Sequence, residues 1–91
     1  MRREVQIINE LGLHARPAAE FVRCAMTFES EILLRKGDDS YSAVSILDVL
    51  SANLDRGAKV TLEAIGPDAE EALNRLAQLL AEFAEQDGTL H

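Results

Sequence analysis

The stretch GLHARPAA, residues 12–19, joins a segment with the pattern of a strand to a segment with the pattern of a helix. Residues 4–8 alternate between polar and apolar side chains, which predicts a half-buried strand that includes Ile8. Gly12 breaks this pattern, and Pro17 suits the first turn of a helix, where a missing N–H costs nothing. The stretch therefore predicts a strand-to-helix junction with His14 at or just before a helix N-terminus.

A histidine in this position stands beside an anion site. The first backbone N–H groups of a helix have no intrahelical acceptor and carry the positive end of the helix dipole. Arg16 adds a guanidinium that can bind phosphoryl oxygens. These features suit a phosphoryl group held covalently on His14, although a surface histidine without chemistry at a helix cap has the same local pattern.

The same octet resembles the active-site signature of the HPr family, the histidine-containing phosphocarriers of bacterial phosphotransferase systems. The resemblance extends from about Val5 to about Phe83. It implies that His14 accepts a phosphoryl group on Nδ1 from phosphorylated enzyme I, with phosphoenolpyruvate as the ultimate donor, and passes it to a IIA protein or domain. The other segments that carry the resemblance are Phe21-Val22, Ala25, Phe28-Glu29-Ser30, Ser45-Ile46, Gly57 and Gly66.

Around His14 we expect the phosphoryl oxygens to be stabilised by the backbone N–H groups of Ala15 and Arg16 and by the Arg16 side chain, with Pro17 fixing the helix start. The sequence has no metal-ligand cluster, glycine-rich phosphate loop or second acid or base near His14, so we expect no metal and no cofactor. This favours a phosphoryl carrier over an independent enzyme. The alternative is a small regulatory or ligand-binding module without phosphoryl transfer.

Residues 45–54 predict a short second helix. Ser45 can cap its first turn, and Asp48 favours the positive end of that helix. Ser45 also aligns with the family's regulatory serine, the substrate of HPr kinase/phosphorylase in many bacteria, but Val44 stands where a lysine or another polar residue often precedes it. Ser45 is therefore either a regulatory phosphorylation site or only a helix cap.

The apolar residues of this second helix do not form a single stripe. Val49 and Leu54 can face inward, whereas Ile46, Leu47 and Leu50 are expected to leave apolar surface outside. An apolar surface beside a reactive group is a candidate docking surface for partner proteins.

The remaining segments predict the order βαββαβα, which implies one antiparallel sheet covered on one face by helices, an α+β two-layer domain. The resemblance implies an open-faced sandwich of four strands and three helices, with the His14 loop and the second helix close together at one edge. Residues 86–91 are expected to form a flexible tail. The other predicted elements are a helix over 15–27, strands over 31–36, 41–43 and 59–65, a turn over 37–40, and a helix from about 69 to 84.

Composition limits the class of protein. The 91 residues, 47% of them hydrophobic, suffice for one domain over 1–91. A net charge of -7 with nine scattered Lys and Arg argues against nucleic acid, so we expect protein partners. The single Cys24 excludes an internal disulfide and is expected to be an incidental, partly exposed thiol.

No apolar run in the sequence resembles a signal peptide or a membrane span, so we expect a cytoplasmic monomer without membrane insertion. The resemblance leaves two branches open, sugar uptake and nitrogen-type regulation. Val44 before Ser45 and the segment GPDAEEA at residues 66–72 resemble the nitrogen-type members.

Overall fold

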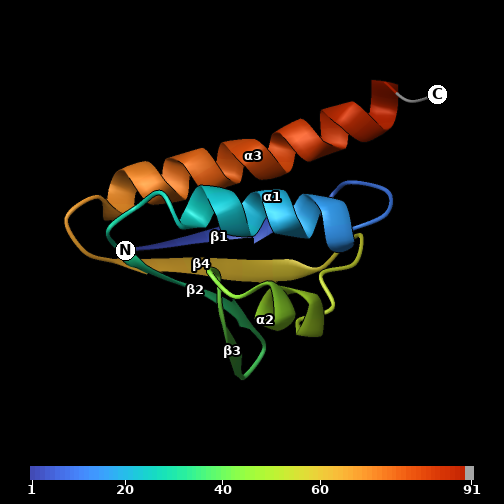
Figure 1. Cartoon of the computed structure of the whole chain (residues 1–91). Coiled ribbons are helices and arrows are strands. Elements are labelled where there is room, and N and C mark those ends of the chain that lie inside the picture. Colours follow the sequence, from blue (N-terminus) through green and yellow to red (C-terminus); the bar gives the residue numbers. More distant parts are fainter. Residues whose placement is uncertain (90–91) are drawn as a thin grey trace.

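The computed structural model describes residues 1–89, with side chains described for residues 1–85. One antiparallel sheet has the strand order β1-β4-β2-β3. Helices α1 and α3 lie side by side over one face of this sheet, and α2 contacts α1 and β3 (Figure 1). The predicted α+β open-faced sandwich is confirmed. Its elements are β1 (Arg2–Gln6), α1 (Ala15–Ala25), β2 (Glu31–Lys36), β3 (Asp39–Ser42), α2 (Ile46–Ser51), β4 (Lys59–Ile65) and α3 (Ala69–Thr89).

The core lies between the sheet and the helices. Along a strand, successive side chains point to opposite faces, so only every second residue of β2 and β4 points toward the helices. Ile32 and Leu34 of β2 and Val60 and Leu62 of β4 are buried in this way. They belong to one apolar cluster with the inner faces of the helices, including Phe21 of α1.

The strand boundaries of β2 and β4 agree with the prediction, whereas those of β1 and β3 differ. Strand β1 ends at Gln6, because Ile7 exchanges backbone hydrogen bonds with residues 57–58 in the loop before β4. Ile8 is consequently exposed and lies outside the strand. Strand β3 begins at Asp39 because the hairpin loop consists of two residues only, and its first residue, Gly37, has the positive φ (+62°) that such loops require.

The helix ends also differ from the prediction. Helix α1 ends at Ala25, two residues early, and α2 ends at Ser51, before Asn53 adopts a left-handed φ of +51°. Lys36 on β2 holds that end of α2, since its Nζ donates to the carbonyl oxygens of Ala52 and Asn53 at 2.9 and 2.8 Å. Helix α3 continues through residue 89, so the predicted helix end near residue 84 is too early and residues 86–89 are helical. Residues 90–91 of the predicted tail lie outside the described residues.

Asp68, just before α3, ties the β4–α3 turn to the segment after α1. Its carboxylate accepts hydrogen bonds from the backbone N–H groups of Glu29 and Ser30, both at 2.9 Å, and from the Ser30 hydroxyl. These bonds, the Ser30 hydroxyl first among them, hold the pKa of the Asp68 carboxyl below its usual range.

The exchange Asp68→Asn is expected to remove a pH-dependent part of the stability. Because the folded pKa is lower than the unfolded value of about 3.9, the carboxylate stabilises the fold above that value, and this contribution is lost as the pH falls through the folded pKa. Urea unfolding should therefore show a stability advantage of the wild type at neutral pH that shrinks in acid. An advantage of equal size at both pH values would contradict the assignment.

Candidate functional site

His14 is the N-cap residue of α1. Its backbone is extended (φ -78°, ψ -172°), and its side chain makes no capping hydrogen bond. The His14 carbonyl accepts the first intrahelical bond, from the N–H of Ala18 at 2.9 Å. The predicted position of His14 at the helix start is therefore confirmed. The residue is also exposed, so the imidazole is accessible at the surface.

The first turn of α1 places hydrogen-bond donors next to His14. The N–H groups of Ala15 and Arg16 belong to the part of a helix that has no intrahelical acceptor, and both residues are exposed. Pro17 is buried, has no N–H and fixes the backbone of this turn. Together with the positive end of the helix dipole and the Arg16 guanidinium, these groups make the surface around His14 suitable for an anion.

The loop that carries His14 packs against the segment that follows α2. Leu13 donates its N–H to the carbonyl oxygen of Leu54 at 2.8 Å. Gly12 has a φ of +65°, and a Cβ at this position would lie 2.5 Å from the same Leu54 oxygen. Only glycine permits both this conformation and this close approach. The end of α2 is thus held beside the His14 loop, as the resemblance implies.

Asn9 is part of this loop and was not predicted to have a role at the site. It is only 2% exposed, and its side-chain Nδ2 donates to the carbonyl oxygen of Gly12 at 2.6 Å. The Gly12 N–H in turn donates to the backbone carbonyl of Asn9 at 3.0 Å. An asparagine three residues before a loop glycine is a sequence signal for such a side-chain to backbone bond.

Helix α2 has the predicted cap at its start. The Oγ of Ser45 accepts a hydrogen bond from the N–H of Asp48 at 3.2 Å, and the Asp48 carboxylate accepts one from the N–H of Ser42 at 3.0 Å. Asp48 therefore places a negative charge within the first turn of α2. Ser45 itself is half-buried.

The outer face of α2 is apolar. Leu47 is 74% exposed, and Ile46 and Leu50 are also exposed, whereas Val49 and Leu54 are buried. The predicted division into inward and outward residues is therefore right. Three further apolar residues are exposed and were not predicted to belong to an apolar surface: Ile8, Leu11 and Val44.

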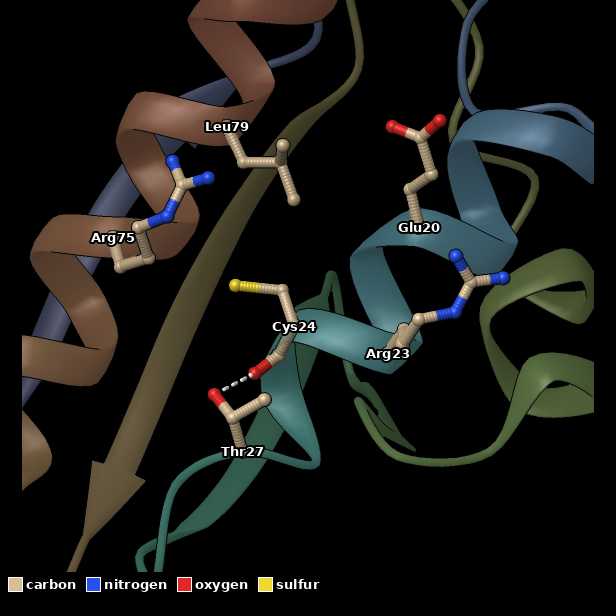
Figure 2. A pocket seen from close by; sticks show the side chains of 6 residues that line it. All are labelled: Glu20, Arg23, Cys24, Thr27, Arg75 and Leu79. Carbon is tan, nitrogen blue, oxygen red and sulfur yellow. Dashed lines mark hydrogen bonds between the residues drawn. The ribbon is translucent and has the colours of Figure 1, made fainter.

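Further along α1, a groove of about 460 Å³ lies between α1 and α3. Figure 2 shows the half-buried Cys24 side chain directed toward α3, where Arg75 and Leu79 line the opposite wall. Arg75 is already paired with Glu82 at 3.5 Å. Burial raises the pKa of the Cys24 thiol, which disfavours the reactive thiolate. The raised pKa therefore does not favour Cys24 as a nucleophile.

Among residues 1–85, whose side chains the structure describes, no group of three or more His, Cys, Asp or Glu could hold a metal ion. In the same part of the chain, no helix combines the length and the apolar character needed to cross a membrane.

The fold and the site define a class of protein: a small α+β domain that presents one histidine at a helix N-terminus beside an exposed apolar helix. Comparison with known families shows that residues 1–82 match the model described as PTS HPr component phosphorylation site. The chain belongs to this HPr family, and its function is that of a phosphocarrier of the phosphotransferase system.

Individual relatives resemble the chain over most of its length. The phosphocarrier protein HPr of Vibrio cholerae is 40% identical over 78 residues, which cover 86% of this chain and 92% of that protein. The crystal structure of HPr from Thermoanaerobacter tengcongensis superimposes with a TM-score of 0.89 at 38% identity and covers 93% of this chain and 96% of that chain.

The HPr-like protein Crh of Bacillus subtilis is 39% identical over 82 residues, which cover 90% of this chain and 96% of Crh. A Crh crystal structure described as a swapped, intertwined dimer matches with a TM-score of 0.73 at 40% identity, covering 89% of this chain and 93% of that chain. The family therefore includes members that assemble as dimers.

Proposed function

We propose that His14 is the phosphoryl acceptor of this carrier, that phosphorylated enzyme I is its donor, and that a IIA protein or domain receives the group from it. The observation that carries this proposal is the exposed His14 at the N-cap of α1, next to the donors of the first helical turn. The chain acts as a phosphorylated intermediate and not as an independent enzyme. Its relay serves sugar uptake or nitrogen-type regulation.

In the transfer step, an imidazole nitrogen of His14 attacks phosphorus. A nitrogen–phosphorus bond forms as the bond between phosphorus and the donor enzyme breaks. The N–H groups of Ala15 and Arg16 and the Arg16 guanidinium stabilise the charge on the phosphoryl oxygens. Because these donors lie at the surface, water screens their attraction. Such loose stabilisation suits a group that must leave again.

Intact-mass measurement tests this function. The protein is incubated with phosphoenolpyruvate, magnesium and enzyme I, and we expect it to gain one phosphoryl group that acid removes, as expected for phosphorus bound to nitrogen. A protein that gains no phosphoryl group, or one that keeps it in acid, would contradict the proposal and favour the regulatory or ligand-binding alternative.

The outer face of α2 supports a docking role. Ile46, Leu47 and Leu50 form an exposed apolar surface, and the backbone bond between Leu13 and Leu54 holds the end of this helix beside the His14 loop. We therefore assign the docking of enzyme I and of the IIA protein to this surface.

For Ser45 the geometry supports the role of a helix cap. A phosphate on Ser45 would gain from the helix dipole but would share the first turn of α2 with the Asp48 carboxylate, and like charges repel. The charge of Asp48 in this first turn therefore favours the cap role of Ser45 over its phosphorylation by HPr kinase/phosphorylase.

Replacing Ser45 with alanine should lower the free energy of unfolding by about 1 kcal/mol, because the N–H of Asp48 loses its acceptor. Ser51→Ala is the matched control, since the Ser51 hydroxyl only donates to the Leu47 carbonyl near the end of the same helix. Urea unfolding of both variants measures the effect. Equal stability of Ser45→Ala and the wild type would remove the cap role.

We propose that the carrier works as a monomer in the cytoplasm. A single chain completes its own four-stranded sheet and its own apolar cluster, which supports a folded monomer. Light scattering coupled to size-exclusion chromatography tests this point. A mass of two chains would instead indicate a dimer, as described for Crh.

A further inference from the structure

The peptide unit that joins Gly12 to Leu13, one residue before His14, is held at both of its polar atoms. Its carbonyl oxygen accepts from Asn9 Nδ2 at 2.6 Å, and its N–H donates to the Leu54 carbonyl at 2.8 Å. The backbone carbonyl of Asn9 also accepts a hydrogen bond from the N–H of Gly12 at 3.0 Å. A peptide plane fixed at both atoms leaves the following Leu13–His14 segment little rotational freedom.

Burial strengthens this arrangement. Asn9 and Leu13 are both buried, and hydrogen bonds are stronger away from water. His14, by contrast, is exposed and makes no capping hydrogen bond with its side chain. The direction in which the imidazole leaves the surface therefore depends on the backbone beneath it.

Among the described residues, the hydrogen bond to the Gly12 carbonyl is the one bond that the Asn9 side chain makes. The Oδ1 atom of Asn9 is buried and has no hydrogen-bond partner among the described residues. An unpaired buried acceptor destabilises a fold, so the gain from the Nδ2 bond is partly offset. The one bond that the Asn9 side chain makes therefore acts on the loop that carries His14.

We infer that Asn9 is a positioning residue for phosphoryl transfer: through the Gly12 carbonyl, its side-chain amide sets the orientation in which His14 meets the donor enzyme and the N–H groups of Ala15 and Arg16. This inference rests on the proposed acceptor role of His14.

The variant Asn9→Ala is expected to lower kcat for transfer from enzyme I by about tenfold, because small losses of alignment are costly for group transfer. Its KM for this transfer should change less than about twofold, since the docking residues of α2 are untouched. We expect it to stay folded, with a melting temperature lowered by less than about 8 °C.

Asn74→Ala is the matched control. Asn74 is also an asparagine with one side-chain partner, since its Oδ1 accepts from Arg3 Nη1 at 2.8 Å, but it lies exposed on α3. This variant should keep the wild-type kcat. A wild-type kcat for folded Asn9→Ala, or a change confined to KM, would overturn the inference.

Hydrogen exchange tests the hold on the loop independently of phosphoryl transfer. The Leu13 amide should exchange at least about tenfold faster in Asn9→Ala, with α3 unchanged. If the wild type takes no phosphoryl group, the acceptor role of His14 fails, while the exchange measurement still tests whether Asn9 holds the loop. Unchanged exchange of the Leu13 amide in Asn9→Ala would overturn that hold. If Asn9→Ala does not fold, the transfer kinetics and the Leu13 exchange are measured on Asn9→Ser instead, well below the melting temperature of that variant. The same results then support or overturn the inference.

Discussion

Replacing His14 with alanine is expected to abolish phosphoryl acceptance from enzyme I while leaving the fold intact. No other residue of the site supplies a nucleophilic nitrogen at the start of α1, so the loss should be complete. The side chain is exposed and caps nothing, and surface changes of this kind alter stability by less than about 0.5 kcal/mol. Intact mass after incubation with phosphoenolpyruvate and enzyme I measures acceptance, and thermal unfolding measures the fold.

The sequence offers a matched control for this variant, because His91 is the only other histidine. His91→Ala should accept the phosphoryl group as the wild type does. If His14→Ala still acquires an acid-labile phosphoryl group, the acceptor is elsewhere and the central proposal fails.

The second large effect is expected at the docking surface. Leu47→Asp places a charge on the most exposed apolar side chain of α2. Full burial of a leucine is worth about 1.5–3 kcal/mol, and a factor of ten corresponds to about 1.4 kcal/mol. We therefore expect KM for transfer from enzyme I to rise about tenfold or more, with kcat at saturation less affected.

Met26→Asp is the control for this exchange. Met26 is 65% exposed, close to the value for Leu47, but it stands at the C-terminal cap of α1, the opposite end from His14. Steady-state kinetics of the two variants should differ strongly. Equal KM values for Leu47→Asp and the wild type would show that partners do not dock on this face.

Much of the site follows from local patterns. Gly12, His14 and Pro17 predicted a helix start at His14 from their local properties, and the structure places His14 at the N-cap of α1 accordingly. The cap at Ser45 and the outward direction of Leu47 follow from local hydrogen bonding and helical periodicity in the same way. These features depend on residues within a few positions of one another, so the sequence contains enough information to predict them.

The loop beneath His14 could not be predicted to the same degree. The pattern over residues 4–8 suggested a strand reaching Ile8, but Ile7 pairs with residues 57–58, about fifty positions away, and this ends β1 at Gln6. The burial of Asn9 and the close approach of Gly12 to Leu54 likewise depend on a segment that is distant in sequence. A turn composition indicates where the chain reverses but not what it packs against.

The sequence by itself determined the order of elements, the boundaries of β2 and β4 and the position of His14 at the start of a helix, because periodicity and capping are local properties. Only the tertiary structure decided the strand order β1-β4-β2-β3, the continuation of α3 through residue 89, and the backbone bond between Leu13 and Leu54 that attaches the His14 loop to the segment after α2. Periodicity indicates which face of an element is buried, but the partner of that face is selected by packing and backbone hydrogen bonds between distant segments.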